Sequence, residues 1–176
     1  MFIIGIIVIC ILGTLLHFTY ELSNHNKVVA IFSAVNESTW EHIKICMTAT
    51  ILWSLYDGYV FGLNPNYFIG KSLSLLIIII LMPVLFYLYT AFTKKSILVI
   101  DIISFYIVVI CSQQVFKYFI NMDALPFTYV YLSFILLIIE FGSYMFLTFQ
   151  PIKNFIFKDP ISKKYGLKGH TEMHHH

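Results

Sequence analysis

Five long apolar segments dominate the chain, and shorter polar or charged stretches separate them. A helix needs about 20 predominantly apolar residues to cross the hydrocarbon core of a bilayer. Each segment is long enough to do so, although two of them carry an aspartate. The expected transmembrane helices are Phe2–Tyr20, Ile43–Leu63, Phe68–Tyr89, Ile97–Tyr118 and Phe127–Phe149. The pattern therefore predicts an all-α polytopic membrane helix bundle with about five transmembrane helices.

The stretches between these segments have the composition of loops. Pro65 lies between two asparagines in a predicted turn, and the loop that ends at Pro126 cannot continue a helix through the proline. Pro83 lies inside the third segment, where it predicts a kink. Residues 150–176 are too few and too polar to form a core of their own. The chain is thus expected to divide into a transmembrane bundle, residues 1–149, and a tail, residues 150–176.

Composition agrees with a membrane protein, because 59% of the residues are hydrophobic and 11% are charged. A soluble domain carries about 25% charged residues. The expected location is the cell membrane, with several passes and with membrane lipid as the main partner. The first segment lacks the basic leader of a cleaved signal peptide, so we expect it to be retained. The three cysteines have no spacing typical of a disulfide framework or a zinc knuckle.

The lysines predict an orientation. All 11 basic residues are lysines, which is too sparse a charge for nucleic acid to be an expected partner. With five spans, nine lysines fall on one side and two, Lys71 and Lys117, on the other. The positive-inside rule then places the N-terminus outside and the C-terminus in the cytoplasm. We expect the tail to lie on the membrane, with its lysines facing anionic lipid and with Phe155 and Phe157 inserted.

Histidines and glutamates gather at the predicted cytoplasmic mouth of the bundle, where the first span ends and the second begins. His17 and Glu21 are one helical turn apart, and Glu37, Glu41 and His42 open the second helix. Ionisable residues at a membrane are costly unless they are paired, hydrated or functional. Imidazole and carboxylate together suit a divalent transition metal or proton transfer.

A structural role is the alternative for part of this group. Glu37 and Glu41 are expected in the first turn of a helix, where the helix dipole favours acidic residues, and Ser38 with Glu41 has the spacing of a capping box. Lys44 is close enough to pair with either glutamate. The candidate site comprises His17, Glu21 and His42 as metal ligands, Glu37 and Glu41 as catalytic carboxylates, and Asn36 and Trp40 as supporting residues. The terminal run from His174 to His176 has the form of a purification tag and is not assigned to the site.

Three more carboxylates lie within predicted spans. Asp57 is about 22 Å along the helix from His42, so the two cannot share a small site. Its alternatives are a second polar cavity or a contact through tyrosine hydroxyls. Asp101 is about 6 Å inside its span and could join the mouth or pair with the nearby lysines Lys94 and Lys95. Glu140 is about 14 Å deep, where it is expected to be protonated or to have a partner.

Two segments at the mouth resemble the signature of a known family. His17 to Glu21 (HFTYE) and Ala34 to Lys44 (AVNESTWEHIK) resemble motifs of small multi-pass bacterial membrane proteins classed as a domain of unknown function. The tail segment from Lys164 to His170 (KYGLKGH) is similar to that family's cytoplasmic ending. The resemblance implies a helical membrane fold and marks motif positions at His17, Glu21, Asn36, Glu37, Trp40, Glu41 and His42. It implies no activity, substrate or cofactor.

Three functions stay open at this point. In the first, a metal-polarised water, with a glutamate as general base, acts on a lipid-soluble substrate that arrives between helices. In the second, Asp57, Asp101 and Glu140 mark the depths of a proton or cation pathway in a small transporter or channel. Five spans are few for a monomeric transporter, so that function predicts a homo-oligomer. The third is a non-catalytic membrane protein whose mouth docks a cytoplasmic partner.

Overall fold

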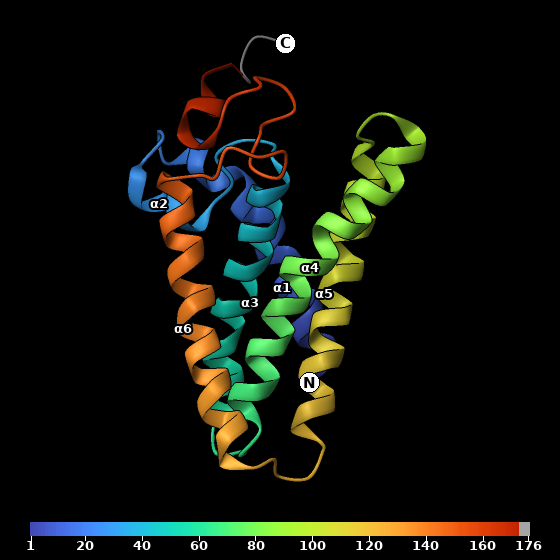
Figure 1. Ribbon diagram of the computed structural model, residues 1–176, viewed down its shortest axis with the longest axis vertical. Helices are drawn as coiled ribbons and strands as arrows, with labels where there is room; N and C mark the ends of the chain where they lie inside the picture. The colour runs from blue at the N-terminus through green and yellow to red at the C-terminus, as the bar shows by residue number, and fades with distance from the viewer. Residues whose placement is uncertain (173–176) are drawn as a thin grey trace.

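Five long helices run up and down through the molecule and are joined at alternate ends by loops (Figure 1). The computed structural model describes residues 1–172, so the run from His174 to His176 lies outside the described residues. The long helices are α1 (Phe2–Leu22), α3 (Thr39–Phe61), α4 (Tyr67–Thr93), α5 (Leu98–Ile120) and α6 (Phe127–Phe149). A short helix, α2 (Lys27–Phe32), follows α1, and a 3-10 helix, η1 (Gly166–Glu172), lies in the tail. The predicted all-α bundle is confirmed, since no strand forms within residues 1–172.

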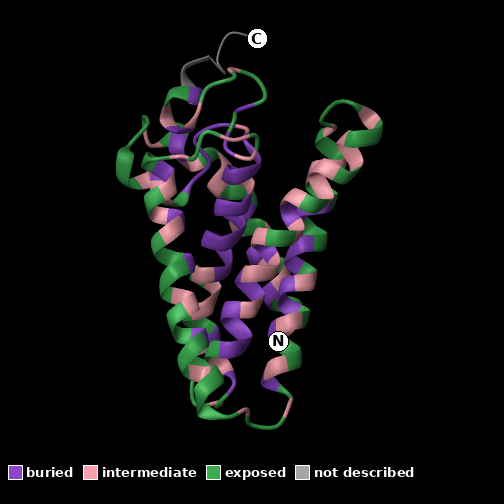
Figure 2. Ribbon diagram, in the orientation of Figure 1, coloured by how far each residue is buried: buried purple, intermediate pink, exposed green. Residues whose placement is uncertain are grey.

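Four of these helices, α1, α4, α5 and α6, are long and apolar enough to cross a membrane. Helix α3, which corresponds to the expected second span, is not one of them. It carries Glu41, Lys44 and Asp57, and 12 of its 23 residues are buried. Buried residues crowd its upper half in Figure 2. Because α1, α4 and α5 pack against it, the half of α3 from Thr39 to Thr50 is almost entirely enclosed by protein, whereas Leu55 and Tyr59 further along are exposed. The polar side chains of α3 are tolerated where they are buried against protein.

Helix α4 continues through Pro83 and ends at Thr93, beyond the predicted end at Tyr89. Proline removes a backbone hydrogen bond and clashes with the preceding turn, so it bends a helix. In Figure 1 the upper halves of α4 and α5 lean away from α3 and α6. Helix α5 follows α4 because the two pack along their lengths. The α4–α5 hairpin therefore diverges from the rest of the bundle at its upper end.

Glycine brings the upper part of α1 close to α5. Gly13 lies directly against the ring of Phe105, and a Cβ atom at this position would collide with the ring. His17 follows Gly13 by one turn on the same face of α1. This close contact therefore fixes the end of α1 beside α5 and α3, where His17 lies.

The tail packs over the loop formed by residues 33–38, and we call this end of the bundle the tail-covered end (Figure 1). The backbone N–H of Trp40 donates to the carbonyl of Ile156 at 3.0 Å. The ring of Phe157 is buried and stacks on Trp40, with 4.6 Å between ring centroids. The expectation that Phe157 inserts into the membrane is therefore wrong, because Trp40 offers it a protein surface. Phe155 is exposed.

Candidate metal centre

Three side chains from three parts of the chain meet at the tail-covered end. His17 comes from the end of α1, Glu37 from the loop, and His42 from the first turns of α3. Oε2 of Glu37 lies 3.6 Å from Nε2 of His17 and 3.9 Å from Nε2 of His42. The ligand atoms of all three lie within 4.8 Å of one another. We call these residues the His-Glu-His cluster.

The spacing of the cluster is close to that of ligands around one metal ion. Metal–ligand bonds of about 2.0–2.2 Å at tetrahedral or octahedral angles separate neighbouring ligand atoms by about 2.8–3.6 Å. The distance from Glu37 to His17, 3.6 Å, lies at the upper end of this range, and the distance to His42, 3.9 Å, lies just beyond it. The two histidine ligand atoms lie within 4.8 Å of each other. The three side chains would have to draw closer together to share one ion. The cluster is therefore a candidate ligand set that is close to, but wider than, the geometry of a bound metal.

The ring of His42 is held in the tautomer that a metal ligand needs. Its Nδ1 lies 3.0 Å from the carbonyl oxygen of Ser38. A carbonyl can only accept, so Nδ1 carries the hydrogen and donates it. In the neutral ring the lone pair is then on Nε2, which faces Glu37. Ligating histidines usually show this arrangement, with the second nitrogen bonded to a carbonyl or carboxylate.

The electrostatic surroundings of Glu37 favour its ionised form. Burial of the carboxyl opposes ionisation, but its hydrogen bond with His17 and the positive charges that His17 and His42 carry when they are protonated outweigh the burial. The pKa of Glu37 is therefore below its ordinary value of 4.5. A carboxylate that stays ionised is available as a metal ligand at neutral pH.

This shift predicts a pH dependence of stability. A carboxyl whose pKa is lower in the folded protein stabilises the fold above its unfolded-state pKa, and the contribution is lost as the pH falls through the folded-state pKa. We expect metal-free wild-type protein to have a higher unfolding midpoint than Glu37→Gln at about pH 6, and the gap to narrow as the pH falls below 4.5. Thermal unfolding in detergent at a series of pH values measures it. A gap that widens on acidification would contradict the assignment.

The tail holds the loop that carries Glu37. The backbone N–H of Glu37 donates to Oδ1 of Asp159 at 3.0 Å, and Asp159 is fully buried. The amide of Asn36 donates to the carbonyl of Gly166 at 2.9 Å, while its oxygen accepts from the N–H of Ser38 at 2.8 Å. A Cβ atom on Gly169 would press on the Asn36 side chain at 3.1 Å. The loop motif and the tail motif therefore form one unit.

Asp159 was not among the residues that the sequence predicted for the site. The residue precedes Pro160, and aspartate before proline is typical of a turn. Its carboxylate also accepts from the N–H of Ser162, so it organises the tail as well as the loop. The turn was visible in the sequence, but its contact with Glu37, 122 residues away, was not.

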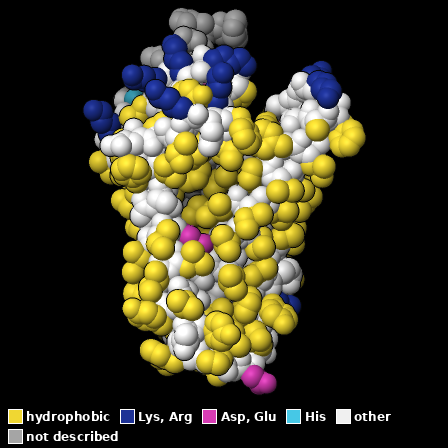
Figure 3. Space-filling model, viewed as in Figure 1, with side chains coloured by type: hydrophobic (Ala, Val, Ile, Leu, Met, Phe, Trp, Pro, Cys, Tyr) yellow, Lys and Arg dark blue, Asp and Glu magenta, His cyan; other side chains and the backbone are white. Residues whose placement is uncertain are grey.

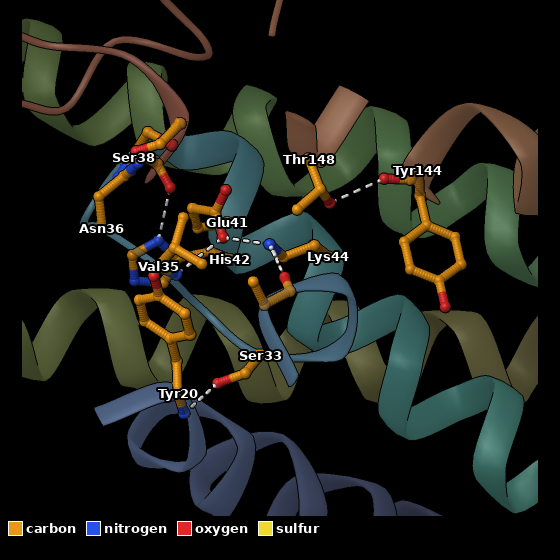
Figure 4. A network of polar contacts seen from close by, with 12 residues as sticks. Tyr20, Ser33, Val35, Asn36, Ser38, Glu41, His42, Lys44, Tyr144 and Thr148 are labelled. Carbon is orange, nitrogen blue, oxygen red and sulfur yellow. Dashed lines mark hydrogen bonds and ion pairs between the residues drawn. The ribbon is translucent and has the colours of Figure 1, made fainter. Parts of the chain in front are cut away.

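Glu41 and Lys44, both in the first turns of α3, form a buried ion pair (Figure 4). Their charged atoms lie 2.6 Å apart, and both side chains are buried. Glu41 also accepts from the N–H of Val35 at 3.0 Å, and Lys44 donates to the carbonyl of Ala30 at 2.8 Å. The predicted capping box is wrong, since the Ser38 side chain makes no cap hydrogen bond. The Glu41 carboxylate accepts from the N–H of Val35, which precedes the helix, and its ion pair with Lys44 keeps it buried.

The remaining predicted residues of the mouth lie around the cluster. Glu21 is exposed on the last turn of α1 and is not part of the group of ligand atoms. Asn36 holds the loop as described, and Trp40 is buried against Phe157. The structure thus brings His17, Glu37 and His42 together and leaves Glu21 apart.

The three deeper carboxylates lie in separate environments. Asp57 forms an ion pair with Lys71, whose ammonium lies 3.6 Å from the centroid of the Phe116 ring. Asp101 accepts from the hydroxyl groups of Tyr89 and Ser96. Glu140 is buried, and within the described part of the chain neither of its oxygens has a hydrogen-bond partner.

The fold and the cluster define a class: a helical protein with four apolar helices, as expected of a membrane protein, and a candidate metal centre at one end. The chain belongs to a family of unknown function (DUF6512), whose model matches residues 1–167. The expected membership of an uncharacterised family is thereby confirmed. No curated protein and no solved structure matches the chain. The functional conclusion therefore rests on the geometry of the cluster.

Proposed function

We propose that this protein binds a divalent transition metal through Nε2 of His17, Oε2 of Glu37 and Nε2 of His42, and that the metal activates water for hydrolysis. The observation that carries the proposal is the meeting of these three atoms within 4.8 Å from α1, the loop and α3. Two imidazoles and one carboxylate suit zinc or ferrous iron. The Ser38 carbonyl behind His42 and the Asp159 carboxylate behind the Glu37 backbone support the ligands.

Three protein ligands leave at least one coordination position for water or substrate. Structural zinc sites close all four positions with protein, whereas catalytic sites keep one open. A metal in such a site lowers the pKa of bound water to near 7 and polarises the bond that is attacked. The chemistry that the cluster supports best is therefore metal-assisted hydrolysis.

Glu37 and Glu41, which the sequence predicts to be catalytic, have different roles in this proposal. Glu37 is a ligand, because its carboxylate faces both histidines. Glu41 is structural, because Lys44 and the N–H of Val35 occupy its carboxylate. Glu21, nominated as a ligand, is left out because it lies outside the cluster. The metal itself then lowers the pKa of the water, and a separate general base is not required.

The proposal includes a location in the cell membrane with several passes. Exposed lysines gather on the tail and on the tip of the α4–α5 hairpin, both at the tail-covered end (Figure 3). By the positive-inside rule this end faces the cytoplasm. The N-terminus then lies outside and the metal centre faces the cytoplasmic surface of the membrane.

The proposal is tested by metal binding to purified, tag-free protein. We expect elemental analysis to find about one zinc or iron per chain, and Co²⁺ titration to give an absorption band typical of nitrogen and oxygen ligands. Glu37→Gln should lower the affinity at least about 10-fold, because a neutral amide is a weaker ligand. Glu21→Gln is the matched control and should bind as wild type does.

Two results would overturn this proposal. One is wild-type protein that takes up no stoichiometric metal from zinc, iron or cobalt solutions. The other is loss of metal in Glu21→Gln with retention in Glu37→Gln, which would favour the ligand set suggested by sequence alone.

A further inference from the structure

An unpaired carboxyl group is buried in the apolar part of the bundle. Glu140 lies on α6, about 14 Å along the helix from its tail-covered end, and is 3% exposed. Within residues 1–172 neither of its oxygens has a hydrogen-bond partner, and none of the ion pairs includes it. Burying an isolated carboxylate costs far more free energy than burying a neutral carboxyl group. Glu140 is therefore protonated in this environment.

The elements that pack against α6 direct their charges elsewhere. These elements are α2, α4 and η1. Lys71 on α4 pairs with Asp57, and Lys44 on the nearby α3 pairs with Glu41. The other lysines of the packed elements are exposed, namely Lys27 on α2 and Lys168 on η1. The tyrosine hydroxyls of α4 donate to groups other than Glu140. A proton is therefore the counter-charge that this carboxylate takes.

Buried polar side chains lead from Glu140 toward the tail-covered end. Tyr144 lies one helical turn from Glu140 on the same face of α6 and is 1% exposed. Its hydroxyl lies close to that of Thr48 on α3, and the Thr48 oxygen has no hydrogen-bond partner within the described residues. Thr48 follows Lys44 by one turn, and Lys44 belongs to the buried pair with Glu41 (Figure 4). We call Lys44, Thr48 and Tyr144 the buried polar series.

The polar groups do not continue beyond Glu140 toward the opposite end of α6. The next turn in that direction presents Leu136 and Leu137. The hydroxyl of Ser133, one turn further, donates to the carbonyl of Tyr129 in its own helix. Leucine side chains offer a proton neither a donor nor an acceptor. Glu140 is therefore approached by polar side chains of α6 from one end only.

We propose that Glu140 is a proton-binding site within the membrane, and that its proton is exchanged with the tail-covered end through the buried polar series. A hydroxyl group can donate and accept at once, which suits Thr48 and Tyr144 to this role. In each transfer an O–H or N–H bond breaks on one group as a new one forms on the next. One proton moves, and no oxidant or reductant is needed. The proposal does not depend on the metal centre.

The first test detects the proton on Glu140 in the full chain, reconstituted in phosphatidylcholine bilayers. Infrared spectra at neutral pH should show the carbonyl band of a protonated carboxyl group in the wild type, and Glu140→Gln should lack it. Glu21→Gln, at an exposed position of α1, is the matched control and should keep the band. An equally strong band in Glu140→Gln would overturn the proposal.

A second measurement uses the wild-type chain, so it does not depend on the folding of a variant. Dicyclohexylcarbodiimide is an apolar reagent that reacts with protonated carboxyl groups. Mass spectrometry should find its adduct on Glu140 and not on Asp57, which Lys71 keeps ionised. Equal labelling of the two residues, or labelling of neither, would contradict a protonated Glu140.

The route is tested by the rate at which the Glu140 proton exchanges with D₂O, followed by the isotope shift of the same infrared band. Tyr144→Phe and Thr48→Val each remove one hydroxyl group and should slow the exchange at least about 10-fold, because a positioned proton donor contributes a factor of about 10²–10⁴. Ser133→Ala is the matched control, since it removes a buried hydroxyl two turns beyond Glu140. Its exchange should occur at the wild-type rate. Circular dichroism checks that the helices form in each variant.

Three outcomes would overturn the route. The first is an unchanged exchange rate in both Tyr144→Phe and Thr48→Val. The second is slower exchange in Ser133→Ala, which would place the entry at the opposite end. The third is a pH gradient across liposomes that wild-type protein dissipates and Glu140→Gln does not, since the proton would then cross the membrane instead of returning to the end from which it came.

Discussion

Replacing His42 with alanine is expected to lower the zinc affinity of the protein at least about 100-fold. Loss of a residue that only supports a ligand costs 10- to 100-fold, so loss of a direct ligand should reach the upper end of that range or exceed it. The His42 side chain is 27% exposed, so its removal leaves no large cavity. Competition between the protein and a chelating dye measures the affinity.

His25→Ala is the matched control for this prediction. His25 lies in the turn after α1, packs on the ring of Tyr20 and is not part of the cluster. Its variant should bind zinc as wild type does. Equal zinc affinity in His42→Ala and wild type would show that His42 is not a ligand and that its position beside Glu37 is structural.

Lys44→Met is expected to lower the free energy of unfolding by about 3–5 kcal/mol. The substitution leaves the Glu41 carboxylate buried without its cation, and it removes the hydrogen bond to the carbonyl of Ala30. A buried charge that loses its partner is among the most destabilising changes known for single residues. Equilibrium unfolding in mixed detergent micelles measures the change. Lys117→Met, at an exposed position of α5, should change the free energy by no more than about 0.5 kcal/mol.

The double variant Lys44→Met with Glu41→Gln separates the pair from the two single residues. A neutral glutamine still accepts the N–H of Val35 and no longer buries a charge, so we expect the double variant to be more stable than Lys44→Met. If the two single effects simply add, the residues do not act as a pair. Weakened zinc binding in Lys44→Met would show that this pair also steadies the loop that carries Glu37.

The sequence determined the class of fold because the relevant signal is local. Long apolar runs can satisfy their backbone hydrogen bonds in a bilayer only as helices, so their lengths predict the helices α1, α4, α5 and α6. The same argument predicted a fifth membrane span at Ile43–Leu63, but α3 is not among the helices that are apolar enough to cross a membrane. Its Glu41, Lys44 and Asp57 are tolerated because neighbouring helices bury them, and burial by neighbours is not a local property.

The candidate site was visible in the sequence as a group of residue types, since histidines and glutamates are rare in an apolar chain and costly at a membrane. Which of them meet was decided by tertiary structure. Spacing along one helix pairs Glu21 with His17, yet the loop from 33 to 38 turns Glu37 toward His17 and His42. Spacing likewise could not show that Lys44 pairs with Glu41, since Glu37 was also close enough in sequence to pair with it.

The position of Glu37 depends on contacts that span almost the whole chain. Asp159 and Gly166 hold the loop from the tail, more than a hundred residues away in sequence. Glycine at 13 fixes the end of α1 against Phe105, so that His17 lies beside the loop. Hydrophobic length and side-chain chemistry are local, so the sequence alone was enough to predict the helices and the residue types at the candidate site. Which three side chains meet depended on the tertiary structure, because they come from distant segments that must converge within a few ångströms.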